Sequence, residues 1–462
     1  MIQNIEIPIR EAEYPAPFAH ALEFNPPAHG TWNIVHIGMN VPEAQQIYVC
    51  AVNCMRGVVL TAAEMNRAER FSFVILKEED LIEGTVEDIT IQGVADVLRK
   101  LPKLPPAVCL FTVCTHHFLG CDINRIYREL EEEFPEIDFI RGYMDPILQK
   151  EGLTPDQKLR ISMYRVLKDA HTEKDSAALI GTNVSLADTC DLKRLLAAEG
   201  ISFLQMPDTE SYEEYVRLGE ADLFLSVVPN GRLPVQLTAQ RLGKKGLYLP
   251  MTFDYEEIKN QENVLLDWVE QRKRESPVKG MEVTDCNGSC LASGDRGATD
   301  REQWFSQEIA ACEESLLQAK QLMGDAPVWI DYVVHPRPLG LAKLLLQHGF
   351  RVEKVFLNAV NTEEEAAFSW LQREAPELLL CSTIQPLNRI HPRKTREKTL
   401  AIGPQAAWFA GTGYFVNMVE GGNLQGFDGI RRMAQLMQEA WCEEKDTRDL
   451  VPRKGLGCES CV

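Results

Sequence analysis

The sequence has no apolar stretch long enough to cross a membrane. A membrane helix needs about 18 uninterrupted apolar residues, and no run in the 462-residue chain approaches that length. The beginning of the chain, MIQNIEIPIREAEYP, also lacks the basic segment and apolar run of a secretory signal. We therefore expect a cytoplasmic protein with no membrane partner.

Positive charge is scarce as well. The chain has 48 Lys and Arg against 68 Asp and Glu, a net charge of −20. Such a surface repels a phosphate backbone, so we expect no nucleic-acid partner. The negative charge could help the protein dock to a basic patch on another protein. Alternatively, it has no special role, because many cytosolic proteins are acidic. A G-x-x-x-x-G-K-[ST] phosphate loop is absent too, which assigns any ATP chemistry to a partner.

Cysteine, in contrast, is abundant. The chain has 13 cysteines, an odd number, and a cytosolic compartment keeps thiols reduced, so a disulfide framework is improbable. Several cysteines fall in close pairs: Cys50/Cys54, Cys114/Cys121, Cys286/Cys290 and Cys458/Cys461. Paired thiols in a reducing compartment indicate binding of a soft metal or redox chemistry.

Short apolar, β-branched runs alternate with helical patterns along the chain. Val108–Val113 is predicted to be a strand and Ile123–Phe134 an amphipathic helix that ends at Pro135. Such alternation is typical of parallel sheets built from βαβ units. The predicted fold class is α/β, with three Rossmann-like, doubly wound parallel-sheet domains. The predicted domains span residues 20–150, 165–280 and 300–445, and a cysteine-containing tail spans residues 446–462.

The same patterns predict the remaining elements. The predicted strands are 137–140, 177–184, 201–205, 223–228, 246–249, 328–334, 352–358 and 378–381. The predicted helices are 186–199, 212–218, 235–242, 255–274, 302–323, 339–347, 363–373 and 426–444. Residues 276–300 are rich in Gly, Ser and Asp and are predicted to form an exposed connection.

Four cysteines in the first predicted domain are candidate metal ligands: Cys50, Cys54, Cys114 and Cys121. Four thiolates can complete a [4Fe–4S] site. Zinc also accepts four thiolates, but its Cys₄ sites usually have tight C-x₂-C pairs, and the spacings here are looser. The alternative is that these thiols pack as small apolar groups. We favour that alternative for the cysteines inside apolar segments: Cys109, Cys190, Cys312 and Cys381.

Two histidine-containing segments follow predicted strands, where ligands bind in doubly wound sheets. His116 and His117 could ligate or tune a cofactor, or simply form an exposed pair at a strand end. Arg337 could bind an anionic substrate with its guanidinium. His335 could donate a proton, because its ordinary pKa is near 6.5. A rigid His-Pro-Arg-Pro turn explains the second segment equally well.

Several segments resemble component 1 of nitrogenase and its relatives, including dark-operative protochlorophyllide reductase. They occur in the family's order and cover nearly the whole chain. The segments are His29-Gly30, VCAVNCMRG, CTHHFLGCDI, GTNVSLADTCDLKRLLAAEGI, VVHPRP and GTGYFVNMVEGGNLQGFDGIRRMAQLM. The resemblance implies three Rossmann-like domains, a homologous or identical partner subunit, and a bridging iron–sulfur cluster, [4Fe–4S] in type. It also implies a separate ATP-dependent iron protein that delivers electrons.

The sequence departs from true nitrogenase at the iron–molybdenum cofactor. The family holds that cofactor through a cysteine after a middle-domain strand and a histidine in the C-terminal domain. The matching segments here, LFLSVVPNGRLP and WFAGTGYFVNMVEGGN, contain neither residue. We therefore expect no iron–molybdenum cofactor and no reduction of dinitrogen by it. The usual HG-x-x-G-C run is also missing, because HGTWNIVHIG has no cysteine.

Three hypotheses follow. The first is an anaerobic iron–sulfur oxidoreductase subunit that reduces an unidentified substrate. The second is a non-catalytic scaffold or carrier for metallocofactor assembly, and the third is a small-molecule-binding sensor with structural cysteines. The pairs Cys286/Cys290 and Cys458/Cys461 could bind a second metal, or have no fixed role.

Overall fold

The computed structural model describes residues 6–18, 34–144, 153–169, 175–275, 298–383, 395, 397–422 and 424–446. The chain divides into two compact units. Of the described residues, those within 34–185 and 204–248 form what we call the N-terminal unit. Those within 6–18, 186–203 and 249–446 form the C-terminal unit.

The N-terminal unit begins with a four-stranded parallel sheet in the order β3-β2-β4-β5. Its strands are β2 (Gln45–Cys50), β3 (Phe71–Ile75), β4 (Ala107–Val113) and β5 (Asp138–Met144). Its helices are α1 (Ile34–Met39), α2 (Val52–Glu64), α3 (Glu78–Glu83), α4 (Val86–Lys100), α5 (Cys114–Phe118), α6 (Ile123–Glu133) and α7 (Pro155–Arg165). Because β3 and β4 flank β2 on opposite sides, the strand order reverses between β2 and β4.

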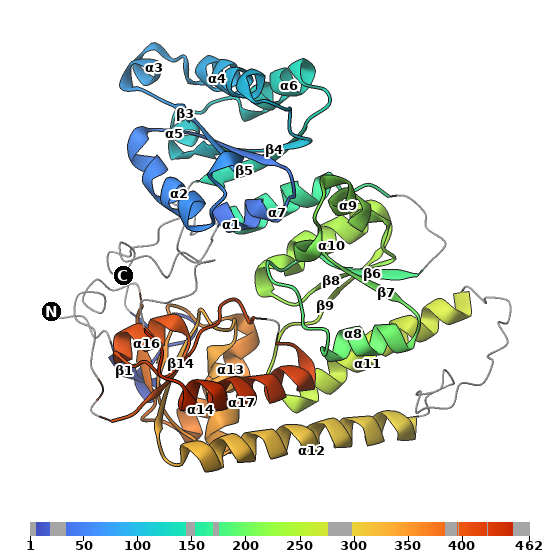
Figure 1. Cartoon of the computed structure of the whole chain (residues 1–462), viewed down its shortest axis with the longest axis vertical. Helices are drawn as coiled ribbons and strands as arrows, with labels where there is room; N and C mark the ends of the chain where they lie inside the picture. The colour runs from blue at the N-terminus through green and yellow to red at the C-terminus, as the bar shows by residue number, and fades with distance from the viewer. Residues whose placement is uncertain are drawn as a thin grey trace. The chain divides into compact units, whose positions relative to one another are not determined.

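Helices cover both faces of this sheet (Figure 1), and alternate residues of β2 belong to two different apolar clusters. Ile47 and Val49 belong to the apolar cluster that includes residues of α4 and α6. Tyr48 and Cys50 belong to the cluster that includes residues of α1, α2 and α7, and the Tyr48 ring stacks on Phe111 of β4 at 4.3 Å. Both faces are covered, which is why β2 and β4 are buried along their whole length.

A second parallel sheet has the order β7-β6-β8-β9. Its strands are β6 (Ser176–Leu179), β7 (Ser202–Gln205), β8 (Leu223–Ser226) and β9 (Lys245–Tyr248). The helices that follow its later strands are α9 (Tyr212–Arg217) and α10 (Pro229–Leu242), while α8 (Asp191–Ala198) belongs to the C-terminal unit. Glycine brings two of its turns together, since a Cβ on Gly181 would lie 3.1 Å from the Cα of Gly231 and 2.2 Å from the Ser226 Oγ.

The C-terminal unit contains a six-stranded sheet in the order β1-β12-β11-β10-β13-β14, with only β1 antiparallel. Its strands are β1 (Glu6–Pro8), β10 (Pro327–Asp331), β11 (Arg351–Phe356), β12 (Leu379–Cys381), β13 (Leu400–Ile402) and β14 (Phe415–Val416). Its helices include α11 (Tyr255–Glu275), α12 (Ala298–Met323), α13 (Pro338–Gln347), α14 (Glu365–Glu374), α16 (Pro404–Ala410) and α17 (Gly426–Cys442). The long helices α12 and α17 pack side by side (Figure 1).

The predicted fold class, α/β with three parallel sheets, is confirmed. The predicted domain boundaries at 20–150, 165–280 and 300–445 stay a prediction. Within the described ranges, no helix is long and apolar enough to span a bilayer. The predicted features at His29-Gly30, Cys286/Cys290 and Cys458/Cys461, and the tail at 446–462 apart from Asp446, lie outside the described residues.

Candidate functional site

The thiols predicted as ligands lie at the carboxyl edge of the N-terminal sheet. Cys50 is the last residue of β2, and Cys54 lies in the first turn of α2. Cys114 follows β4 directly and begins α5. β2 and β4 are adjacent parallel strands, with Tyr48 opposite Phe111, so their ends lie about 5 Å apart. The edge between them is where the strand order reverses, the position at which doubly wound sheets bind ligands.

Cys54 and Cys114 form a thiol pair at this edge. Cys54 is exposed and Cys114 is half-buried. Partial burial raises the pKa of the Cys54 thiol, and the charge of Cys114 raises it further. Neither residue is buried, and we call these two thiols the edge pair.

Cys50 belongs to the interior. Its side chain is fully buried in the apolar cluster with Tyr48 and Val58. Burial raises the pKa of the Cys50 thiol to about 12, with a smaller contribution from Cys54. A thiol in this state packs as a small apolar group, although it lies close to the edge pair.

Cys121 has different neighbours. It is half-buried against the apolar cluster that includes residues of α4 and α6. Burial raises its pKa, and the next cause is the carboxylate of Glu87, not another thiol. In the described part of the chain, no three His, Cys, Asp or Glu side chains converge in an arrangement that would hold a metal ion. The four predicted ligands are therefore not assembled as a set, and their roles stay a prediction.

The two histidines after Cys114 differ from each other. His116 is buried, its Nδ1 accepts a hydrogen bond from the Val113 N–H at 3.3 Å, and its Nε2 lies 3.1 Å from the Thr90 hydroxyl. Burial lowers the pKa of His116 to about 4, so the ring is neutral and supports the loop. His117 is exposed, with its ring 6.2 Å from that of Phe118. Cofactor binding by either residue stays a prediction.

Exposed apolar side chains accompany the edge pair. Val52 and Val59 of α2 are 62% and 45% exposed, and Phe118 and Leu119 at the end of α5 are 67% and 47% exposed. Phe118 lies four residues after Cys114 on α5, so it shares a helix face with that thiol. Large apolar side chains gathered on the surface mark interaction sites more often than isolated ones do.

His335 and Arg337, the predicted catalytic residues, lie in the C-terminal unit after β10. His335 is buried, its ring lies 4.4 Å from that of Phe253, and its Nδ1 accepts a hydrogen bond from the Arg337 N–H. Burial lowers the pKa of His335 to about 3, so the ring is neutral at physiological pH. Arg337 lines a cavity of about 430 Å³. The catalytic roles of both residues stay a prediction.

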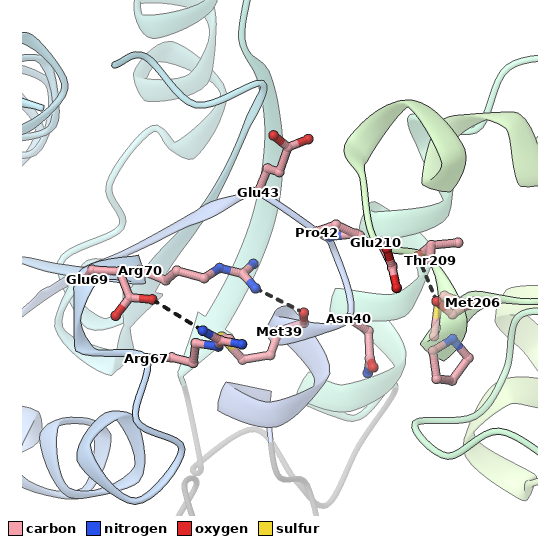
Figure 2. A pocket seen from close by; sticks show the side chains of 11 residues that line it. Met39, Asn40, Pro42, Glu43, Arg67, Glu69, Arg70, Met206, Thr209 and Glu210 are labelled. Carbon is pink, nitrogen blue, oxygen red and sulfur yellow. Dashed lines mark hydrogen bonds and ion pairs between the residues drawn. The ribbon is translucent and has the colours of Figure 1, made fainter. Parts of the chain in front are cut away.

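A smaller cavity of about 230 Å³ in the N-terminal unit was not predicted from the sequence (Figure 2). Its lining includes Arg67 and Arg70. The Arg70 Nε donates to the carbonyl oxygen of Ala44 at 3.0 Å and its Nη2 to that of Val41 at 2.6 Å, while Arg67 pairs with Glu69 at 4.0 Å. Because Arg70 is used to hold the loop before β2, this cavity offers little to a ligand, and its volume is below the range of about 300–1,000 Å³ for ligand pockets.

Comparison with solved structures reveals a whole-chain likeness. A structure described as nitrogenase Cp1 at pH 6.5 superposes with a TM-score of 0.60 at 13% identity, covering 92% of this chain and 94% of that one. The fold is that of nitrogenase Cp1. A second structure of nitrogenase Cp1, at pH 5, gives a TM-score of 0.53 at 11% identity and covers 94% of this chain and 93% of that one.

The likeness to nitrogenase Cp1 is one of fold. No protein-family model and no curated protein sequence matches the chain. The coverage is nearly complete for both partners of the comparison.

Proposed function

We propose that the chain is one subunit of a nitrogenase-like iron–sulfur reductase in which Cys54 and Cys114 supply cluster ligands. The observation that carries the proposal is the edge pair: two thiols, neither of them buried, that follow adjacent parallel strands at the point of strand reversal. The nitrogenase-like fold supports the same class of activity. An iron–sulfur cluster bound there would supply one-electron transfer at low potential.

A second subunit completes the ligand set in this proposal. Cys54 and Cys114 are too few for a four-iron cluster, and no third ligand within the described residues joins them. The exposed side chains of Val52, Val59, Phe118 and Leu119 give a partner an apolar surface beside the thiols. We commit to a homologous or identical subunit as the partner, because an identical copy would bring the same edge pair and yield four thiolates.

The residues around the edge pair prepare it for this role. Partial burial keeps the Cys54 pKa above its usual value, so the thiol stays protonated until a metal displaces the proton. His116 fixes the start of α5 through the Val113 N–H. An ATP-dependent iron protein delivers the electrons in this proposal, because the sequence has no phosphate loop of its own. The substrate is one other than dinitrogen.

Anaerobic reconstitution tests the proposal. The chain is incubated with ferrous iron and sulfide, and iron, sulfide and molecular mass are measured. We expect about two irons per chain, four per pair of identical chains, and a shift from monomer to dimer that depends on iron. Iron content that stays near zero after reconstitution, with the purified chain alone and with a co-expressed homologue, would contradict the proposal.

A scaffold that carries a cluster for another protein is the second candidate. An open pair of ligands with one exposed thiol favours it, because a cluster held by few ligands is transferred easily. The two candidates separate in one assay. A reductase oxidises the iron protein and turns over substrate, whereas a scaffold passes its iron to an acceptor apoprotein without turnover.

A further inference from the structure

The C-terminal unit contains a cavity of about 430 Å³ that is distinct from the edge pair. It is lined by the beginning of α11, by α13 and by the beginning of α14. Its volume lies within the range of small-molecule sites. Apolar side chains line part of it, including Phe253, Leu344, Ala366 and Ala367.

Arg337 enters this lining with an incompletely used guanidinium. The residue is only 6% exposed. Its Nη1 donates to the Thr252 hydroxyl at 2.9 Å and to the Glu257 carboxylate at 2.5 Å. Its Nε is buried without a partner, and Nη2 forms no hydrogen bond within the described residues. A buried donor left without an acceptor is destabilising, so an acceptor at this position would be stabilising.

The two unused nitrogens lie on one edge of the guanidinium. Nε and Nη2 together present the planar fork that grips a carboxylate or phosphate with two parallel hydrogen bonds. Thr252 and Glu257 hold Nη1, so the orientation of the fork is fixed before any ligand arrives. A donor pair fixed in advance loses little conformational entropy when it binds.

The lining contains six acidic residues: Asp254, Glu256, Glu257, Glu313, Glu363 and Glu364. Glu256 pairs with Lys259 at 2.8 Å, Glu313 pairs with His348 at 3.0 Å, and Glu257 pairs with Arg337. Glu363 accepts a hydrogen bond from the Thr362 hydroxyl at 3.3 Å. Glu364 accepts hydrogen bonds from the Leu339 and Gly340 N–H groups at 2.6 and 2.9 Å. Burial raises its pKa to about 8, so Glu364 carries no charge at neutral pH. Asp254 pairs with Lys343 at 3.2 Å. The acidic groups named here therefore do not exclude an anion from the Arg337 end of the cavity.

We propose that this cavity binds a small organic acid, with its carboxylate or phosphate on the Nε–Nη2 fork of Arg337 and its apolar body against Leu344, Ala366 and Ala367. The site assigned here is a small-molecule site, independent of iron binding at the edge pair. It gives Arg337 the function of an anion-binding residue and gives His335 the function of holding the Arg337 backbone.

Three probes of similar shape test the proposal on the full chain without iron: benzoate, phenyl phosphate and the neutral amide benzamide. Isothermal titration or ligand-observed NMR gives their affinities. We expect at least one acid to bind with a millimolar or lower dissociation constant, and benzamide to bind about tenfold more weakly or worse. The tighter of the two acids identifies the anionic group that the site prefers.

Two variants locate the binding. Arg337→Lys keeps the charge but removes the fork, so it should weaken acid binding about tenfold or more and leave benzamide unchanged. Gly340→Leu should abolish binding of all three probes, because a Cβ at Gly340 meets only the Cβ of Arg337, at 3.7 Å, and a larger side chain would extend into open space. Arg99→Lys, a surface change on α4, is the matched control.

The outcomes are decisive because iron is absent from the assay. Equal affinity for acids and benzamide would overturn the proposal, and so would a folded Arg337→Lys or Gly340→Leu variant that binds like the unmodified chain. Absence of binding of either acid to the unmodified chain up to about 10 mM would overturn it as well. Gly340→Leu leaves every charged group in place, so it remains informative if Arg337→Lys fails to fold.

Discussion

The strand order reverses once in the first sheet of the N-terminal unit and once in the sheet of the C-terminal unit. The two points of reversal have the same topology but hold different side chains. Between β2 and β4, the chain leaves the thiols of Cys54 and Cys114 unburied. Between β10 and β13, the corresponding position is filled by the fully buried carboxylate of Asp331. Asp331 accepts hydrogen bonds from the N–H groups of Val333 at 2.9 Å, Val334 at 3.1 Å and Ala406 at 2.8 Å.

This difference shows that topology marks a possible ligand position but does not decide what occupies it. Asp331 uses the backbone N–H groups that would otherwise receive an external anion. In the second sheet of the N-terminal unit (β7-β6-β8-β9), the point of reversal between β6 and β8 is filled by the close approach of Gly181 to Ser226 and Gly231. Among the described residues, only the N-terminal edge has unburied thiols at the point of reversal, which is why we place the cluster there.

The largest effect is expected from Gly403→Ala at the closed C-terminal edge. Gly403 has φ +115°, and its Cβ would lie 2.3 Å from the Asp331 carboxyl atoms. Backbone strain and overpacking together should cost about 4 kcal/mol of unfolding free energy. Gly324→Ala is the control, because it has φ +61° with no atom within 4 Å and should cost about 1 kcal/mol. Denaturant unfolding monitored by hydrogen exchange of each unit separates the two, and equal losses would contradict the closed edge.

Gly181→Ala should have the next largest effect. The added Cβ would lie 2.2 Å from the Ser226 Oγ and 2.6 Å from the Ser226 Cβ, which predicts a loss of about 2 kcal/mol. A second change, Ser226→Gly, removes both clashing atoms and should restore part of the stability lost to the Cβ. The losses of the two single variants can be added to give the stability expected without any interaction. If the double variant is no more stable than this sum, the clash with Ser226 is not the cause of the loss in Gly181→Ala.

The pH dependence of stability gives a smaller effect per pH unit at the closed edge. Burial raises the pKa of Asp331 from 3.8 to about 7. A raised folded-state pKa means that the stabilising contribution is complete below pH 4 and is lost as the pH rises toward 7. Relative to the Asp331→Asn variant, the unmodified chain should lose up to about 1.4 kcal/mol of unfolding free energy for each pH unit in this window. Parallel stability curves for the two proteins would show that Asp331 does not titrate this way.

The smallest effect on stability is expected at the open edge. Cys54 is exposed, so Cys54→Ser should change the unfolding free energy of the iron-free chain by no more than about 0.5 kcal/mol. Cys50→Ser, four residues earlier and fully buried, should cost about 1–3 kcal/mol because it places a hydroxyl in an apolar cluster. Thermal unfolding measures both, and a similar cost at the two positions would mean that the edge is not open.

Much of the fold could be predicted from the sequence because apolar runs mark buried parallel strands. Val108–Val113 is confirmed as part of β4. The prediction did not include β2, because QQIYVC begins with two glutamines; Gln46 is nevertheless fully buried, donating to the Val35 carbonyl and accepting from the Tyr48 hydroxyl. The helix predicted from Val235 begins at Pro229, where proline suits the first turn.

The site was only partly predictable. The close spacing of Cys50 and Cys54 and the predicted strand end before Cys114 identified these thiols, but spacing could not show that Cys121 has Glu87 as its charged neighbour instead of a thiol. Asp331 was read as the interior of a strand from 328 to 334, whereas β10 ends at this residue. Its partner Gly403 lies 72 positions later in the sequence, and a contact over that separation leaves no local pattern.

The central claim is that the edge pair binds iron. Iron content and the electron paramagnetic resonance spectrum of the anaerobically reconstituted, reduced chain test it most directly, with Cys54→Ser/Cys114→Ser compared against Cys121→Ser. We predict that the double variant loses the bound iron and the cluster signal, while Cys121→Ser keeps both. An unchanged iron content and spectrum in the double variant would contradict the account.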